Sequence, residues 1–240
     1  MLFYNIFSQL GVTHEALLAC LAAAIIIVVS LVSHELAHGL VALLNGDDTA
    51  KRSGRLSLNP MVHFDPMGLL MMLLIGFGYA RPVPVNPNNY KNRRCGDITV
   101  ALAGVTTNLI LAFFNALFYM LVVTYAPSEA QGSAMYYFVT FLTWLFYFGI
   151  GINVSLALFN ILPLYPLDGY RFIAAFADEN GRVLTWLRNN GRYILYAFIA
   201  IEYITSFVPQ LEVFSPLYWY FTIFGNLIEG GFIAFWGLFI

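Results

Sequence analysis

The chain has 240 residues, of which 60% are hydrophobic and only 10% are charged. Its mean hydropathy of +0.75 is too high for a soluble domain of this size, so the composition predicts a protein that crosses a membrane several times. The net charge of −2 argues against nucleic acid as a partner, because binding phosphates requires a basic patch.

The first long apolar run predicts a transmembrane helix over residues 15–44. Helix-compatible residues continue until the polar turn Asn45-Gly46-Asp47-Asp48 ends the element. No Lys or Arg precedes residue 51, and no small-residue cleavage site follows the run. We therefore expect this helix to stay in the protein and not to be removed as a signal peptide.

Positive residues fall in three blocks, which the positive-inside rule places in the cytoplasm. The apolar run at 67–80, between the first two blocks, is too short to span a bilayer and predicts a re-entrant segment. Residues 81–87 contain three prolines and alternating valines, which predict an extended, β-like loop at the membrane edge. The blocks are Lys51, Arg52 and Arg55; Arg81, Lys91, Arg93 and Arg94; and Arg171, Arg182, Arg188 and Arg192.

Four later apolar segments complete the predicted topology. Residues 98–125 and 135–162 predict an out-and-back pair of long helices, and residues 193–208 and 217–240 predict two further crossings. The fold class expected is therefore an all-α polytopic membrane protein. It has about five transmembrane helices and the re-entrant, β-like segment, with the N-terminus outside.

The motif His34-Glu35-Leu36-Ala37-His38 places two imidazoles one turn apart on one face of the first helix, where both can bind one metal ion. Glu35, beside them, can act as a general base. Ionisable side chains at the end of a membrane helix are costly without partners, so the motif indicates a functional site. The alternative is a polar cluster that packs helices together. Imidazole ligands favour zinc over magnesium or calcium.

Asp168 is the candidate third ligand, because two histidines leave a zinc site short of ligands. It follows the turn-rich residues 160–167 at the cytoplasmic end of a predicted crossing, the side on which the 15–44 helix also ends. The alternative is a turn or N-cap aspartate. His63 and Asp65 are expected to form a hydrogen-bonded loop and not a second metal site.

These residues resemble the site-2 protease family of intramembrane zinc metalloproteases. The resemblance covers about residues 30–171. It rests on His34-Glu35-x-x-His38, on Ala103-Gly104-x-x-x-Asn108, and on the stretch from Asn160 to Arg171, which is similar to Asn-x-x-Pro-x-x-Pro-x-Asp-Gly-x-Arg. It implies that His34, His38 and Asp168 bind one zinc ion per chain. It also implies that Glu35 activates water and that Asn108 assists at the substrate carbonyl.

The sequence departs from the family pattern near Asn108. The family usually has Gly-Pro before that asparagine, where this chain has Gly104 followed by Val105. The residues also leave open a second role for Asn108, which is a hydrogen bond between helices.

The resemblance further implies hydrolysis of peptide bonds within or near a transmembrane helix of a membrane-protein substrate. We expect one membrane-embedded domain over residues 1–240, with a catalytic core at about 14–171 and accessory helices at about 190–240. No PDZ-like or nucleotide-sensing domain is expected, so control would come from a membrane partner or from pre-cleavage of the substrate. The location implied is the prokaryotic plasma membrane, with the active site toward the cytoplasm.

Three alternatives stay open at this point. One is a metal-binding membrane transporter or a catalytically idle chaperone, which needs no general base between its ligands. Another is a prenyl-processing zinc protease, but in that family the third ligand is a glutamate from a later helix. The loop at 82–87 is either an edge that pairs with an extended substrate or an ordinary connection.

Overall fold

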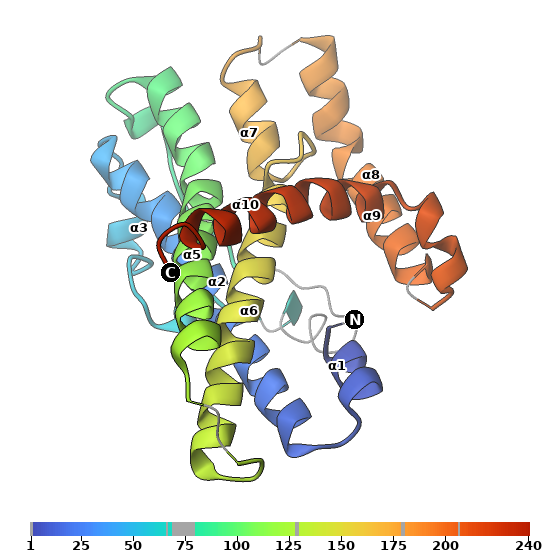
Figure 1. The fold of residues 1–240 in the computed structure, drawn as a ribbon. Coiled ribbons are helices and arrows are strands. Elements are labelled where there is room, and N and C mark those ends of the chain that lie inside the picture. Colours follow the sequence, from blue (N-terminus) through green and yellow to red (C-terminus); the bar gives the residue numbers. More distant parts are fainter. Residues whose placement is uncertain (1, 66, 69–79, 128–129, 179–180, 206) are drawn as a thin grey trace.

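The computed structural model describes residues 2–65, 67–68, 80–127, 130–178, 181–205 and 207–240. Three long helices, α2 (His14–Leu44), α5 (Arg93–Tyr125) and α6 (Ala134–Asn160), pack against one another and form the central bundle (Figure 1). The shorter elements are α1 (Leu2–Leu10), α3 (Thr49–Arg52), η1 (Pro60–Val62), η2 (Pro87–Asn89), α7 (Asp168–Ala174), α8 (Arg182–Thr205), η3 (Pro209–Phe214), α9 (Pro216–Tyr220), the π-helical η4 (Phe221–Gly225) and α10 (Asn226–Trp236).

The three central helices are long and apolar enough to cross a membrane. Their bounds agree with the predicted helices at 15–44, 98–125 and 135–162 to within a few residues at each end. The largest difference is at the start of α5, where the Asn92 side chain accepts a hydrogen bond from the Cys95 N–H and begins the helix earlier.

The structure supports an all-α membrane protein, and among the described residues it contains no β-strand. In the described part of the chain, neither α8 nor the C-terminal helices meet the length and hydropathy expected of a membrane span. Figure 1 shows α10 lying across α5 and α6 instead of alongside them, and α10 contacts both helices. The five crossings therefore stay a prediction.

In α2 and α5 most of the fully buried side chains are small, and many large apolar side chains are exposed. In α2 the fully buried side chains include Ala16, Ala19, Ala22 and Ala23, whereas Leu17, Leu21, Ile25 and Val29 are exposed. The same arrangement recurs in α5, where Ala112 and Ala116 are buried and Phe114 and Phe118 are exposed. Lipid tails are as apolar as leucine, so in a bilayer small residues favour helix contact by allowing close backbone approach. The exposed rows are therefore suited to face lipid.

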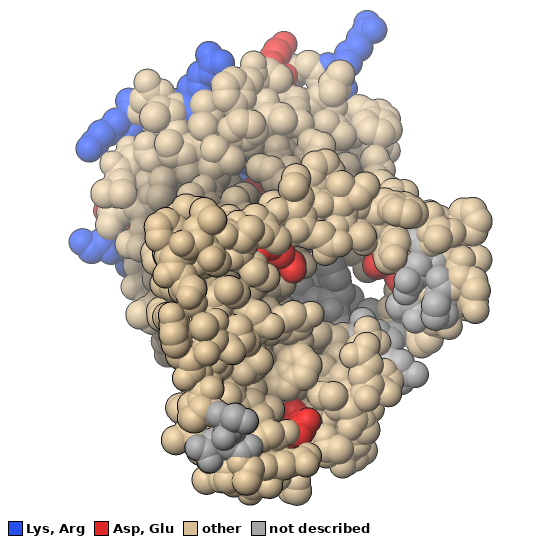
Figure 2. Space-filling view, in the orientation of Figure 1, with Lys and Arg blue, Asp and Glu red and all other residues tan. Residues whose placement is uncertain are grey.

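Lys and Arg gather at one end of the molecule. Figure 2 shows them at the end formed by α3, the start of α5 and the region of α7 and α8, whereas the opposite end of this face carries none. The three positive blocks of the sequence therefore share one end of the bundle. The half of α2 that contains His34 and His38 leads toward that same end.

The predicted re-entrant run at 67–80 lies mostly outside the described residues, but both of its flanks are described. Phe64 and Ala80 form an isolated antiparallel bridge, and the Arg81 N–H donates to the His63 carbonyl at 2.7 Å. The residues on either side of this run therefore lie next to each other. Residues 81–86 contain no helix, as the prolines predict, and they lead into η2.

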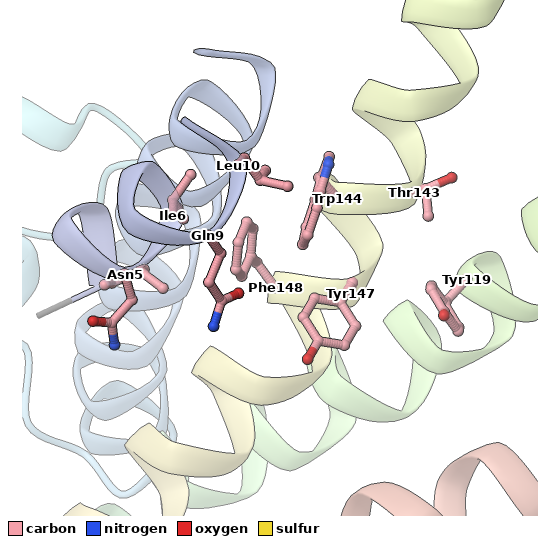
Figure 3. A pocket seen from close by; sticks show the side chains of 10 residues that line it. Asn5, Ile6, Gln9, Leu10, Tyr119, Thr143, Trp144, Tyr147 and Phe148 are labelled. Atoms are coloured by element: carbon pink, nitrogen blue, oxygen red, sulfur yellow. The ribbon is translucent and has the colours of Figure 1, made fainter. Parts of the chain in front are cut away.

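A cavity of about 360 Å³ lies where α1 packs beside α5 and α6 (Figure 3). Asn5, Gln9 and Thr143 give it a few polar groups among aromatic side chains such as Trp144 and Tyr147. The histidines of the sequence motif do not line it. The cavity therefore belongs to the packing of α1, and the chemistry lies elsewhere in the bundle.

Asp47 fastens the loop after α2 to the segment before α5. Its side chain is fully buried, and Oδ1 accepts hydrogen bonds from the Thr49 N–H (3.1 Å) and from Asn89 Nδ2 (2.8 Å), while Oδ2 accepts from the Asn86 N–H (2.6 Å). Burial alone would raise the pKa of Asp47, but these hydrogen bonds outweigh burial and hold the pKa below its usual value.

Replacing Asp47 by alanine should therefore destabilise the protein by about 3 kcal/mol at pH 7, because buried donors lose their acceptor. The folded-state pKa of Asp47 is lowered, so this contribution is present above the unfolded pKa of about 3.9 and is lost as the pH falls through the folded value. The measurement is the thermal unfolding midpoint in detergent from pH 7 to pH 3, where the difference between the variant and the parent should shrink.

The matched control is Asp48→Ala, which removes an exposed ion pair with Arg52. Its effect should stay below about 1 kcal/mol at every pH. Equal effects of the two substitutions at pH 7 would contradict the role assigned to Asp47.

Candidate metal centre

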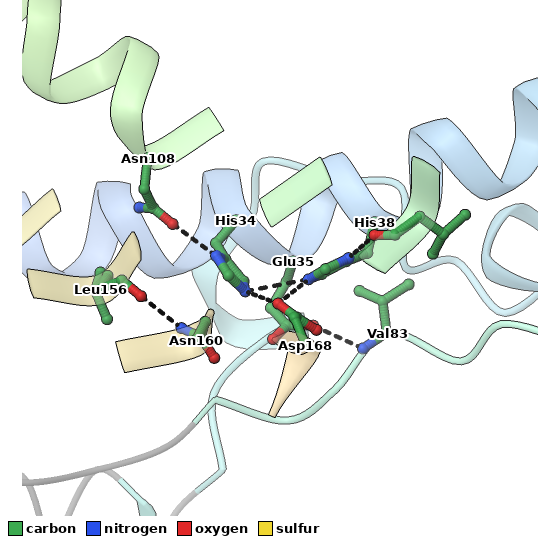
Figure 4. Close-up of polar contacts among 9 residues, drawn as sticks. His34, Glu35, His38, Val83, Asn108, Leu156, Asn160 and Asp168 are labelled. Atoms are coloured by element: carbon green, nitrogen blue, oxygen red, sulfur yellow. Dashed lines mark hydrogen bonds and ion pairs between the residues drawn. The ribbon is translucent and has the colours of Figure 1, made fainter. Parts of the chain in front are cut away.

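Three buried donor atoms from distant parts of the chain meet between α2 and the start of α7 (Figure 4). His34 Nε2 lies 3.2 Å from Asp168 Oδ2, His38 Nε2 lies 3.1 Å from the same oxygen, and the two nitrogens are 3.1 Å apart. All three residues are at least nine-tenths buried. The structure thus brings together the two histidines and the aspartate that the sequence predicts as ligands.

The other nitrogen of each imidazole faces an acceptor on α5. His38 Nδ1 lies 2.7 Å from the Val100 carbonyl oxygen, and His34 Nδ1 lies 2.6 Å from Asn108 Oδ1. A carbonyl oxygen can only accept, so each Nδ1 carries the hydrogen. Each Nε2 then presents a lone pair to the centre of the group, which is the tautomer that a metal-binding histidine needs.

Gly104 allows the His34 ring to lie against α5. A Cβ atom at this position would come within 2.3 Å to 2.6 Å of three atoms of the imidazole ring. Any larger residue would therefore displace the ligand. This close approach gives a physical reason for the glycine in the motif Ala103-Gly104-x-x-x-Asn108.

Asp168 is the first residue of α7, and its side chain points toward the histidines and does not cap the helix. The N-cap residue is Leu167, and it makes no side-chain capping bond, so the alternative of an N-cap aspartate is not what the structure shows. A Cβ atom on Gly169 would lie 2.1 Å from the Ile161 carbonyl oxygen, which explains why glycine follows the aspartate where α7 folds back on the end of α6. Burial alone would raise the pKa of Asp168, but the two imidazoles outweigh burial and hold the pKa well below its usual range.

Glu35 lies beside this group and is held by the loop at 81–87. Its Oε2 atom accepts a hydrogen bond from the Val83 N–H at 2.8 Å. The Val83 side chain is buried, whereas Pro82 and Pro84 on either side are exposed. The extended loop therefore reaches the carboxylate that the sequence predicts as the general base, and Oε1 takes no part in that bond.

His63 and Asp65 form the hydrogen-bonded loop expected from the sequence. His63 is fully buried with Nε2 2.7 Å from the Ser57 carbonyl oxygen, and Asp65 Oδ1 accepts from the N–H groups of Met67 and Gly68. Neither residue belongs to the group of three donors.

The residues fit a zinc ion. Donor atoms around a tetrahedral zinc with bonds of about 2.0–2.1 Å are about 3.3 Å apart, close to the separations of 3.1 Å and 3.2 Å seen here. Within the described residues, Asp168 Oδ2 is buried and accepts no hydrogen bond. Two imidazole nitrogens and a carboxylate oxygen at these distances are suited to hold a zinc ion between them.

Sequence reasoning missed three groups of this centre. Asn153 of α6, 1% exposed, accepts a hydrogen bond from Asn108 Nδ2 at 2.8 Å. A buried asparagine in an apolar helix gave a signal that could have found it. The Val100 carbonyl and the Val83 N–H are main-chain groups, and no residue type reveals them.

The fold and the site together define a membrane protein with a buried group of two histidines and one aspartate that is suited to bind zinc. The model of Peptidase family M50 matches residues 22–201, and the chain belongs to this family, the site-2 protease family of zinc metalloproteases, as the motifs predicted. It is a hydrolase of the metallopeptidase type, and its cofactor is zinc.

Three relatives support this assignment. "Putative zinc metalloprotease YwhC" of Bacillus subtilis is 41% identical over 78% of this chain and 84% of its own length. "Putative zinc metalloprotease Rip2" of Mycolicibacterium smegmatis is 28% identical over 82% of this chain and 71% of its own. "Putative zinc metalloprotease MJ0611" of Methanocaldococcus jannaschii is 33% identical over 45% and 49%. No solved structure matches the chain.

Removing one of the three donors should remove the metal. We expect purified wild type to contain about one zinc per chain, and we expect His34→Ala and Asp168→Ala to retain less than about a tenth of it, because two donors hold zinc too weakly. Zinc is measured by atomic emission after gel filtration in detergent. Asp65→Ala is the matched control and should keep its zinc. Full occupancy in Asp168→Ala would refute the ligand assignment.

Proposed function

We propose that this protein is an intramembrane protease that hydrolyses peptide bonds within or near transmembrane helices of membrane-protein substrates. His34, His38 and Asp168 hold the zinc ion, and Glu35 is the general base. The observation that carries the proposal is the position of the donor group. Its two histidines belong to α2 and contact α5, both of which can span a membrane, and the Glu35 carboxylate beside them is held through Oε2 by the Val83 N–H.

The chemistry assigns one task to each side chain. When bound, zinc lowers the pKa of a coordinated water and polarises the scissile carbonyl. Glu35 accepts a proton from that water as its oxygen adds to the carbonyl carbon. Glu35 then passes the proton to the departing amine nitrogen as the C–N bond breaks. The Val83 N–H, bound to Oε2, orients the carboxylate so that Oε1 can carry the proton.

The loop at 81–87 also limits how a substrate can pair with it. Pro82 and Pro84 are exposed and have no N–H, and the Val83 N–H is bonded to Glu35. Residues 82–84 of the loop therefore offer only carbonyl oxygens to a substrate. A substrate helix must unwind before its own N–H groups are free, and an unwound strand can donate them to these carbonyls.

Glu35→Gln should abolish proteolysis without removing zinc. The amide cannot accept the proton, so we expect a loss of about 10²–10⁴-fold in the cleavage rate. The assay follows a tagged single-span membrane protein reconstituted with the purified protease, with zinc content measured on the same sample. Glu15→Gln, at the other end of α2, is the control and should keep its activity. Unchanged cleavage by Glu35→Gln would refute the role of Glu35 as general base, whereas absence of cleavage by the wild type would favour the transporter or chaperone alternative.

The proposed orientation places the basic end, and with it the active site, on the cytoplasmic side of a prokaryotic plasma membrane. Cys95 is exposed near the start of α5 at this end, and Val12 is 90% exposed before α2 at the other. In a Cys20→Ala background, a membrane-impermeant maleimide should label Cys95 only after the membrane is opened. In a variant that also carries Cys95→Ala and Val12→Cys, it should label intact cells. The reverse pattern would invert the topology.

A further inference from the structure

We propose that Asn108 and Asn153 form a pair that fixes the tautomer of His34, so that Asn108 acts through the histidine and not on the substrate. The proposal rests on the metal site described above. It assigns Asn153 a role in that site, and it gives Asn108 a positioning role in place of the substrate contact implied by the family resemblance.

Asn153, Asn108 and His34 are linked by successive hydrogen bonds. The Gly149 carbonyl at the start of this series can only accept, and this fixes the direction of each bond. Asn153 Nδ2 donates to the Gly149 carbonyl at 2.8 Å, which turns Asn153 Oδ1 toward α5. Asn108 Nδ2 donates to that oxygen at 2.8 Å, which turns Asn108 Oδ1 toward His34. This oxygen lies 2.6 Å from His34 Nδ1, which must donate.

The pair is needed because an asparagine alone is ambiguous. Its oxygen and nitrogen have nearly the same shape, and a half-turn of the amide would present N–H groups to His34 Nδ1. The imidazole would then carry its hydrogen on Nε2 and have no lone pair for the metal. Asn153 removes that arrangement because its oxygen accepts from Asn108. His38 needs no such pair, since its partner is the Val100 carbonyl, which can only accept.

The burial of Asn108 argues against direct contact with a substrate. Asn108 has no exposed surface, and it lies between His34 on α2 and Asn153 on α6. Both of its polar atoms already make hydrogen bonds within the protein. A substrate carbonyl would have to enter the packed contact between three helices to reach it.

The test compares zinc affinity in variants of the full-length protein, measured by competition with a chromophoric chelator. Asn108→Ala and Asn153→Leu should each weaken zinc binding about 10–100-fold, the usual cost of losing an outer partner of a ligating histidine. Asn108→Asp should bind zinc within about threefold of wild type, because one carboxylate oxygen can accept from His34 Nδ1 and the other can accept from Asn153 once its amide turns to present Nδ2. Asn115→Ala is the control and should bind as wild type does, because Asn115 donates to its own helix at Leu111.

Rescue separates a positioning role from a structural one. Asn153→Leu combined with Asn108→Asp should recover most of the zinc affinity lost by Asn153→Leu alone, because a carboxylate needs no partner to orient it. The electronic spectrum of the cobalt-substituted protein should return toward that of wild type in the same double variant. A merely unfolded protein would show neither recovery.

Two results would overturn the inference. If Asn108→Ala binds zinc as tightly as wild type but loses cleavage, and Asn108→Asp loses cleavage as well, Asn108 is a donor to the substrate. If Asn153→Leu binds zinc with unchanged affinity, the pair does not set the tautomer. Failure of the wild type to bind zinc would instead overturn the proposed function.

Discussion

The constraint on which the rest of this structure depends is that three metal-binding groups lie where water cannot solvate them. A buried imidazole or carboxylate costs free energy unless the protein supplies its partners. The surrounding features each meet part of that requirement. Gly104 gives the His34 ring its place against α5, and the Val100 carbonyl accepts from His38. Gly169 lets α7 fold back on α6 so that Asp168 reaches the same point. The packing of α2 and α5 therefore reflects the needs of the site as much as the exclusion of lipid.

How much of this could be predicted from sequence depended on the kind of signal. The long helices and the His34–His38 pair could be predicted because hydropathy and helical spacing are local properties of the chain. Asp168 could be predicted because the positive blocks place it at the same end as the histidines. The orientation of the C-terminal helices relative to the bundle could not be predicted in this way. An apolar run does not reveal whether its helix runs along the bundle or, as α10 does, across it. The hydrogen bond from the Val83 N–H to Glu35 could not be predicted, because every residue except proline has a main-chain N–H.

The loop before α5 links the stability of the fold to the reactivity of the site. Arg55 Nη2 donates to the Arg81 carbonyl at 2.5 Å, Glu35 accepts from Val83, and Asp47 accepts from Asn86. Three side chains from α2 and the region after it thus hold successive parts of one extended segment. One of the three is the proposed general base. A change that loosens this segment therefore alters the orientation of Glu35 even when it touches no ligand.

Contacts within the protein hold the ligands of the site in the orientation that a metal ion needs. The hydrogen bonds of Asn108 and Val100 turn both Nε2 lone pairs toward the Asp168 carboxylate. Zinc binds the ligand set that the fold assembles and not the dispersed ligands of the unfolded chain, so bound zinc stabilises the fold in proportion to the logarithm of the free zinc concentration. Metal binding and the association of α2, α5 and α7 are thus one coupled equilibrium.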